Sequence, residues 1–388
     1  MVRRAKGKKA ARAKGKIKAK SRRAKSAAKR RPKKTAIRTK RKSVARKQAR
    51  SKSKAKRAPA RPKKKDATRG GERRPPTVGP VPASPAASKP EPTGPRSALS
   101  GRAGPRHPEV DLDEYRRSSR DIWERMAPGW EERRDWVWEA SRAVGEWMVD
   151  RLAPQPGQTL LELAAGAGDT GFVAIARLAG EGRLISTDFS PRMVKAAQRR
   201  AAELGLTNIE FRVMDAERMD LAEDSVDGVL CRWGYMLMAD PGAALRETRR
   251  VLRDSGRLVF SVWAGPEHNL WASVPGRVLV ERGHVPPPMS GAPGIFAMAD
   301  PGRVRTLVMD AGFADPEIEV VKMAWTFDDF DGYWEFLVQL AGGVAMTINT
   351  LPLEEQQAIR SDVRARLAAA KTGDGFRLDG VTLNALTS

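Results

Sequence analysis

From residue 111 onward, short apolar runs alternate with segments in which apolar side chains recur every three or four positions. The first pattern is typical of buried strands and the second of amphipathic helices. Strands that alternate with helices indicate right-handed crossovers, so we predict a doubly wound α/β fold with a mostly parallel sheet. The predicted strands are residues 159–164, 183–187, 209–213, 226–231, 257–263, 318–326 and 376–386.

Capping residues predict where the helices of this region begin and end. Ser190-Pro191 and Asp240-Pro241 each place an N-cap before a proline at the first helical position, and Gly205 closes the first of these helices. Two tryptophan-rich helices are expected earlier, broken at Pro128-Gly129, because proline and glycine interrupt helices. The pattern also predicts helices at 116–127, 131–152 and 301–311, and a turn at 254–256.

Two insertions, at about 264–300 and 333–372, are expected to cover the strand ends. The first contains two irregular apolar stretches, Pro286-Pro287-Pro288-Met289 and Pro293-Gly294-Ile295-Phe296. We expect these segments to form a lid over an apolar or aromatic substrate. Ordinary core and loop packing explains the same residues equally well.

Charge divides the chain into two unlike parts. Residues 1–110 hold 40 basic and 4 acidic residues, whereas the rest hold 32 basic and 42 acidic residues, a net charge of −10. Residues 1–65 contain no acidic residue, and the first aromatic residue is Tyr115. Because such a segment buries too little apolar surface to offset its ordering entropy, we predict a disordered basic tail over 1–74. A Pro/Gly/Ser-rich linker over 75–110 precedes one folded domain over 111–388.

The tail resembles the Lys/Ala-rich tails of linker-histone-like nucleoid proteins in composition. Basic side chains displace counterions from phosphates, so we expect the tail to bind nucleic acid or another polyanion without sequence preference. Three alternatives remain open: a solubilising tail, an upstream extension that is not translated, and an organelle transit peptide. We expect the protein in the cytoplasm, associated with the nucleoid if the tail binds DNA.

Composition also excludes several classes of protein. A single cysteine, Cys231, rules out an internal disulfide framework, and three histidines leave little for a metal centre. No apolar run reaches the roughly 18 residues that a membrane span needs. We therefore expect neither a metal hydrolase nor a membrane-spanning protein.

Acidic residues and glycines gather at the predicted carboxyl ends of the strands, where open α/β sheets bind ligands. The stretch 166–171 fits the G-x-G-x-x-G dinucleotide pattern. Glu162, Asp169 and Asp215 would repel a pyrophosphate, however, and they suit a ligand that carries a sulfonium and an ammonium. We therefore favour a positively charged cofactor over NAD.

Residues 160–168, Leu-Leu-Glu-Leu-Ala-Ala-Gly-Ala-Gly, resemble the first motif of class I S-adenosylmethionine-dependent methyltransferases. Ala164 stands where that motif has its first glycine. Four further motifs follow in the family's order, at 185–193, 214–217, 224–229 and 249–258. Within the family, the chain is similar to the enzymes that methylate ubiquinone and menaquinone precursors and other small molecules.

This resemblance implies a seven-stranded Rossmann-like sheet, S-adenosyl-L-methionine as cofactor and a small-molecule methyl acceptor. Asp188 matches the acid that holds the ribose hydroxyls, and Asp215 with Ala216 matches the pair at the adenine. The full set of implied cofactor-binding residues is Glu162, Ala164, Gly166, Gly168, Asp188, Phe189, Met193, Asp215, Ala216 and Arg232.

Methyl transfer needs a general base only when the nucleophile must lose a proton. His268, just after the fifth strand, is the candidate base, although a loop histidine without a catalytic role is the favoured interpretation. Trp233 either flanks the cofactor or packs in the core. Cys231 lacks the setting of a cytosine methyltransferase nucleophile and is interpreted as a buried, inert thiol.

A different class of function stays open at this point. The chain could be a nucleoid-associated DNA-binding protein whose methyltransferase body is vestigial or sensory. The basic tail and the altered glycine at Ala164 favour this alternative.

Overall fold

The computed structural model describes residues 111–289, 291–373 and 375–388. The predictions for the tail 1–74 and the linker 75–110 lie outside these described residues. Within them, one mixed sheet runs in the order β3-β2-β1-β4-β5-β8-β6, and a short strand, β7, pairs with β8. The strands are β1 Thr159–Glu162, β2 Arg183–Asp188, β3 Ile209–Val213, β4 Val226–Arg232, β5 Leu252–Trp263, β6 Glu317–Phe327, β7 Lys371–Thr372 and β8 Gly375–Thr387.

The predicted doubly wound α/β fold is confirmed. Strands β1 to β5 pair in parallel, and β8 runs antiparallel to both β5 and β6. The seven predicted strands form the continuous path of the sheet, and the two-residue β7 is an addition that the pattern did not reveal. Reversal of the strand order beside β1 places the ligand-binding crevice at the carboxyl ends of β1 and β4.

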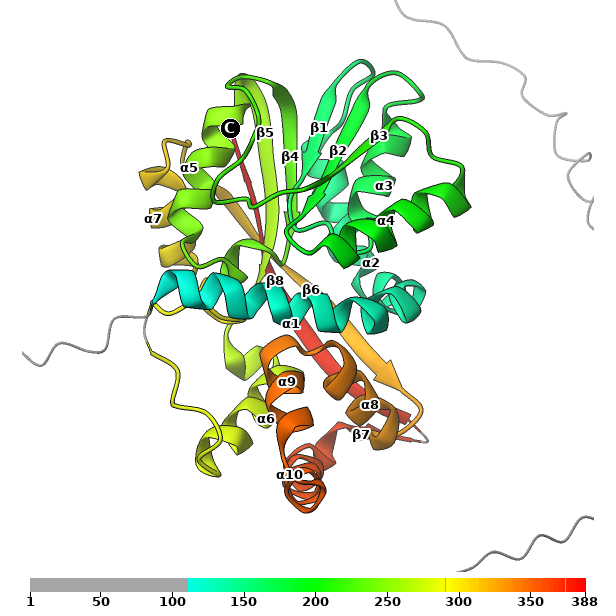
Figure 1. Cartoon of the computed structure of the whole chain (residues 1–388), viewed down its shortest axis with the longest axis vertical. Helices are drawn as coiled ribbons and strands as arrows, with labels where there is room; N and C mark the ends of the chain where they lie inside the picture. The colour runs from blue at the N-terminus through cyan, green and yellow to red at the C-terminus, as the bar shows by residue number, and fades with distance from the viewer. Residues whose placement is uncertain (1–110, 290, 374) are drawn as a thin grey trace, which may run out of the picture. The chain divides into compact units, whose positions relative to one another are not determined.

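Helices surround the sheet and build a second half of the domain below it. In Figure 1, β6 and β8 run on past the upper part of the sheet toward α6, α8, α9 and α10, and α1 lies across the front between the two halves. Helix α1 contacts α4 above and α8 and α9 below. The helices are α1 Leu112–Glu132, α2 Arg134–Leu152, α3 Asp169–Arg177, α4 Pro191–Leu204, α5 Pro241–Val251, α6 Leu270–Glu281, α7 Pro301–Asp310, α8 Phe330–Leu340, α9 Gly342–Thr350 and α10 Leu353–Arg366.

Both predicted N-caps are confirmed by side-chain hydrogen bonds. Ser190 accepts from the backbone N–H of Met193, and Asp240 accepts from that of Ala243. Gly205 ends α4 with φ +68°, a left-handed conformation that glycine adopts without steric cost. These caps anchor the two helices that follow β2 and β4, so they position the loops at the crevice.

The predicted break at Pro128-Gly129 is wrong, because α1 continues to Glu132 and the chain turns at Arg133. A proline inside a helix frees the carbonyl four residues earlier, which here belongs to Glu124. The Arg192 side chain donates a hydrogen bond to that carbonyl at 3.4 Å, so a contact from α4 compensates the lost bond.

The predicted turn at 254–256 is also wrong, because these residues lie inside β5. The β4–β5 pairing shifts register between Val226 and Gly228, so the extra residues of β5 are accommodated as a bulge. The first strand ends earlier than predicted, at Glu162, because the chain turns at Ala164. In the part of the chain that the structure describes, no helix has the length and hydrophobicity to cross a bilayer.

Candidate active site

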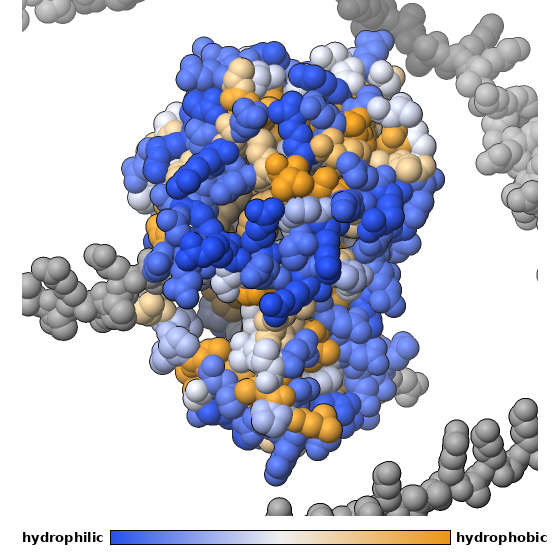
Figure 2. Space-filling model, viewed as in Figure 1, coloured by the Kyte–Doolittle hydropathy of each residue, from blue (hydrophilic) through white to orange (hydrophobic). Residues whose placement is uncertain are grey.

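A cavity of about 470 Å³ opens at the carboxyl ends of the strands. Its upper wall comes from the loops after β1, β2, β3 and β4, and its outer wall comes from α1. Its lower wall is apolar and comes from β5, α6, β6, α8 and the start of α9. Figure 2 shows a mostly hydrophilic face with a hollow just below the N-terminal half of α1.

The loop after β1 is built from backbone in the left-handed region. Ala164, Gly166 and Gly168 have φ values of +50°, +55° and +92°. The loop then enters α3, whose first residue is Asp169. This conformation brings backbone close to the cavity and directs the N-terminus of α3 at it. Ala164 therefore occupies the same kind of conformation that the motif's glycine would adopt, and its side chain is exposed to the cavity.

Replacing Ala164 with glycine is expected to stabilise the fold by about 0.5–1 kcal/mol, since a left-handed alanine is strained and glycine is not. Ala167, which lies in the same loop without a positive φ, is the matched control. Ala167→Gly is expected to destabilise by a similar amount. Thermal or urea unfolding measures the free energy of unfolding of both variants. If the two substitutions destabilise the protein equally, Ala164 is not strained.

Glu162 is buried beneath this loop and supports it. Its carboxylate accepts a hydrogen bond from the backbone N–H of Gly171 at 2.8 Å and contacts the Ser186 hydroxyl at 3.4 Å. An added Cβ at Gly171 would clash with this carboxylate, so the last glycine of the stretch 166–171 makes room for the acid. Burial raises the pKa of Glu162 to about 8, despite the opposing effects of the Gly171 hydrogen bond and Arg232.

This raised pKa predicts a pH dependence of stability. Between about pH 4.5 and pH 8 the folded state keeps a proton on Glu162 that the unfolded state has lost, so stability should fall as pH rises. The slope for one such proton is at most about 1.4 kcal/mol per pH unit. Glu162→Gln should remove this component, whereas Glu181→Gln, at an exposed carboxylate, should not; urea unfolding across this pH range measures both.

Asp188 ends β2 at the wall of the cavity. Its two carboxylate oxygens accept from the backbone N–H groups of Gly166 at 3.0 Å and Ser190 at 2.9 Å. These bonds join the loop after β1 to the cap of α4 and hold the carboxylate in one orientation. Burial raises the pKa of Asp188 to about 6. Each oxygen has a further lone pair, so the side chain can also accept from two neighbouring hydroxyls of a ligand.

The other residues implied by the first three motifs line the same cavity. Asp215 follows β3 and accepts from the backbone N–H of Glu217 at 2.9 Å. Phe189 is partly buried, and Met193 and Ala216 are buried. Of the ten residues implied for cofactor binding, the cavity lining contains Glu162, Ala164, Gly166, Asp188, Phe189, Met193, Asp215, Ala216 and Arg232. Gly168 is the exception: it caps α3 behind them, where an added Cβ would clash with Phe172.

Polar contacts hold helix α1 against the upper wall. The Tyr115 hydroxyl donates to the backbone carbonyl of Leu237 at 3.1 Å. Arg116 donates to Glu217 through Nε at 3.0 Å and Nη2 at 2.5 Å. Glu124 accepts from the hydroxyl of Ser190, the cap of α4, at 2.7 Å. These contacts join segments far apart in the chain, so sequence reasoning did not identify Tyr115, Arg116 or Glu217 as wall residues of the site.

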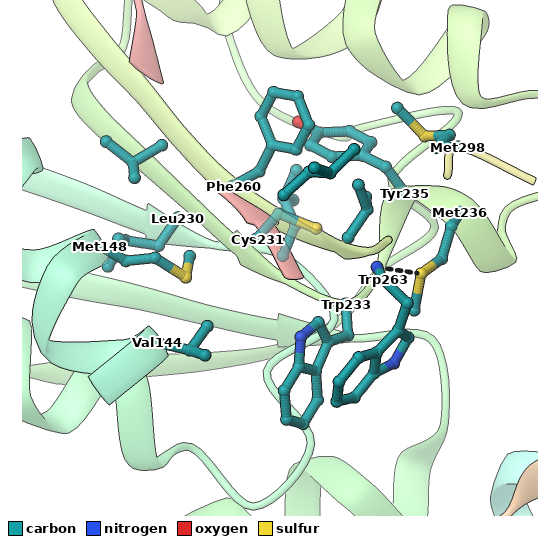
Figure 3. Close-up of a cluster of buried hydrophobic side chains, with 14 of the residues drawn as sticks. Val144, Met148, Leu230, Cys231, Trp233, Tyr235, Met236, Phe260, Trp263 and Met298 are labelled. Carbon is teal, nitrogen blue, oxygen red and sulfur yellow. Dashed lines mark hydrogen bonds between the residues drawn. The ribbon is translucent and has the colours of Figure 1, made fainter. Parts of the chain in front are cut away.

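The lower part of the cavity is an aromatic chamber, formed by the side chains of Trp233, Trp263, Trp271, Trp325 and Phe336. The Trp233 and Trp263 rings stack with centroids 4.4 Å apart, and Figure 3 shows these indoles side by side. Trp325 lies 4.9 Å from Phe336 and 5.6 Å from Trp271 between ring centroids. Trp233 thus packs in the core and also lines the cavity.

The two insertions contribute to this chamber only in part. Trp271, Pro293, Gly294 and Ile295 from the first insertion line the cavity, as do Phe336 and residues 340–344 from the second. The first apolar stretch, 286–289, is absent from the lining and is mostly exposed. Trp325 and Trp263 come from β6 and β5, which the sequence pattern predicted as strands but not as walls of the cavity.

The structure places His268 outside the cavity. It lies on a 3₁₀ turn, its side chain is 57% exposed, and its ring nitrogen is 3.4 Å from Glu267. Cys231 is fully buried, and burial raises the pKa of its thiol to about 12, so the thiol stays protonated at neutral pH. The interpretation of Cys231 as a buried, inert thiol is confirmed.

Comparison with known proteins places the site in context. Residues 154–270 match a family of methyltransferase domains. A ubiquinone/menaquinone biosynthesis C-methyltransferase of Acidiphilium cryptum is 36% identical over 134 residues, which cover 32% of this chain and 53% of that protein. An aklanonic acid methyltransferase of Streptomyces sp. is 30% identical over 118 residues, or 30% of this chain and 54% of that protein.

An arsenite methyltransferase of Halobacterium salinarum is 32% identical over 109 residues, which cover 28% of each protein. The chain thus spans about half or less of the length of these relatives. Among solved structures, the YcgJ protein of Bacillus subtilis aligns with a TM-score of 0.43 and 16% identity, over 63% of this chain and 96% of that one.

Proposed function

We propose, on the premise that residues 154–270 form a methyltransferase domain, that this protein transfers a methyl group from S-adenosylmethionine to a small apolar or aromatic molecule. One observation carries the proposal. Strand-end acids, Asp188 and Asp215, and an aromatic chamber lie in the walls of a single cavity. A cationic cofactor and an apolar acceptor would therefore meet at the boundary between these two parts.

The described residues fit this cofactor. Asp188 retains lone pairs for the two ribose hydroxyls, and the open backbone of the loop after β1 leaves room for the amino-acid part. No lysine or arginine occurs between Glu162 and Gly171, so this turn offers no side-chain cation to a pyrophosphate. Asp169 at the start of α3 adds negative charge, which suits an ammonium and a sulfonium.

Bound S-adenosylmethionine supplies a methyl group that its sulfonium has already activated. The protein then contributes mainly orientation and exclusion of water. The indoles of Trp233 and Trp263, which stack on each other, give the chamber a rigid aromatic wall. Helix α1, tied to the upper wall through Arg116 and Glu217, closes the outer side of the cavity.

Two features support a small acceptor. The chamber lies beneath α1 and between elements of both halves, which favours a molecule that can be enclosed over a polymer. The relatives are named for aklanonic acid, for ubiquinone/menaquinone biosynthesis and for arsenite, and none of these names refers to a polymer. The acceptor of this chain is not implied by any one of them.

Calorimetric titration with S-adenosylmethionine and with NAD tests the proposal. We expect binding of the first and none of the second. Transfer of labelled methyl groups from the cofactor into small molecules of a cell extract tests activity directly. Tight NAD binding without S-adenosylmethionine binding would reject the proposal, and cofactor binding without transfer to any acceptor would favour a vestigial or sensory body.

The basic tail supports a second, separate proposal: that residues 1–74 hold the protein on nucleic acid or another polyanion. The observation is the contrast between 40 basic residues in 1–110 and the net charge of −10 in the rest. The tail would then determine where the enzyme resides, on the nucleoid if the polyanion is DNA, and the cavity would determine what it methylates.

A further inference from the structure

Arg232 is a cation at the boundary between the two parts of the cavity. It ends β4, lines the cavity and stacks over the Trp233 ring, with Cζ 4.7 Å from the ring centroid. Its Nη1 donates to the Ser141 hydroxyl at 2.7 Å, a neutral partner. Within the described part of the chain, Arg232 forms no ion pair within 4.0 Å, although the charges of Asp169 and Glu162 act on it from further away.

A second arginine in the lining provides a contrast. Arg134 is paired with Glu203 at 2.5 Å, so its charge is already compensated by contact. Arg232 is therefore a cavity cation with N–H groups left over for a ligand. If this cavity holds a sulfonium, a cation in its wall is electrostatically unfavourable unless an anion lies between the two charges.

The lining also restricts the chemistry of the acceptor. Among the described residues that line the cavity there is no histidine, lysine or cysteine. Tyr115 donates its hydroxyl to a backbone carbonyl. The carboxylates of the lining lie at the ends of β1 and β2, at the start of α3 and in the loop after β3, on the cofactor side. The aromatic chamber thus offers no side chain suited to remove a proton from a neutral acceptor.

We propose that Arg232 binds the negative charge of the acceptor, and that the acceptor is an apolar or aromatic organic acid already ionised at neutral pH. This inference rests on the proposed function. It assigns Arg232 to the acceptor, whereas the sequence resemblance implied that Arg232 binds the cofactor. The acceptor's anionic atom forms a bond to the methyl carbon while the sulfur–carbon bond breaks. The electron pair of that bond stays on sulfur, both charges are neutralised, and no proton is released.

Matched neutral and anionic probes test this assignment without knowledge of the natural acceptor. We would titrate 2-naphthoate and 2-naphthamide into protein saturated with S-adenosylhomocysteine, which fills the cofactor part of the cavity. Wild-type protein should bind the anion at least tenfold more tightly than the amide, since a hydrogen-bonded ion pair is available only to the anion. Arg232→Gln should remove this preference, and Arg232→Lys should keep part of it.

Arg134→Gln is the matched control, because that arginine lines the same cavity but is already paired. It should leave the preference for naphthoate unchanged. The affinities of S-adenosylhomocysteine and of 5′-methylthioadenosine, which lacks the amino-acid part, are measured for each variant. Thermal unfolding verifies that each variant is folded. The preference of the wild-type protein for naphthoate over naphthamide is measured without any variant, so it tests the inference even if a variant does not fold.

The outcomes are distinguishable. If wild-type protein binds 2-naphthoate and 2-naphthamide equally well, the inference is overturned. A second result also overturns it: the Arg232→Gln variant keeps the preference for naphthoate, binds S-adenosylhomocysteine more weakly and binds methylthioadenosine as well as the wild type does. Arg232 would then hold the carboxylate of the cofactor itself. Failure of wild-type protein to bind S-adenosylhomocysteine would instead reject the proposed function itself.

Discussion

Replacing Asp188 with alanine is expected to weaken S-adenosylmethionine binding by about 1.5–3 kcal/mol, roughly ten- to a hundredfold in the dissociation constant. The carboxylate is buried at the end of β2 and is oriented by the backbone N–H groups of Gly166 and Ser190. Its remaining lone pairs would bind the ribose hydroxyls. Isothermal titration calorimetry measures the loss, and thermal unfolding separates it from loss of the fold.

Two further observations sharpen this prediction. Asp188→Asn keeps one acceptor oxygen and the side-chain volume, so it should lose less affinity than the alanine variant. Because burial raises the pKa of Asp188 to about 6, cofactor affinity of the wild-type protein should fall as pH decreases through that value. Unchanged affinity in a folded Asp188→Ala variant would remove the ribose assignment.

Deleting residues 1–110 is expected to abolish binding of duplex DNA while cofactor affinity stays within about twofold. Residues 1–74 contain 36 basic residues, and the body carries a net charge of −10. With about ten phosphates engaged, the affinity of the whole chain should fall with a log–log salt slope of about −9. The residues implied for cofactor binding all lie beyond residue 160, and distant sites are usually independent.

A tail of the same length in which the lysines and arginines of 1–74 become glutamine is the matched control. It should behave as the deletion does, because the expected binding depends on charge and not on chain length. Gel-shift and calorimetric titrations are made on the same preparations. A truncated body that shifts DNA as well as the whole chain would show that the tail is not the binding element.

The sequence predicted the strands, the helix caps and the acids of the cofactor side because these depend on neighbours close in the chain. Ser190-Pro191 and Asp240-Pro241 specify caps within four residues, and both caps are formed. Asp188 and Asp215 lie at or just after the carboxyl ends of two strands, and in a doubly wound sheet these ends border the ligand-binding crevice. The errors at Pro128 and at 254–256 arose where a distant partner, Arg192 or the paired strand β4, overrode a local signal.

By itself, then, the sequence determined the parallel sheet, the loop after β1 and the charge contrast between tail and body. All three follow from local backbone preference, from periodicity or from composition. Only the tertiary structure decided which aromatic side chains line the cavity. Trp263, Trp325 and Phe336 lie on β5, β6 and α8, and the long strands β6 and β8 carry the lower half of the domain to the cavity. Arg232 likewise became a candidate acceptor ligand only when the fold left it at the boundary of the chamber without an ion-pair partner among the described residues, because long-range packing and not local sequence sets such contacts.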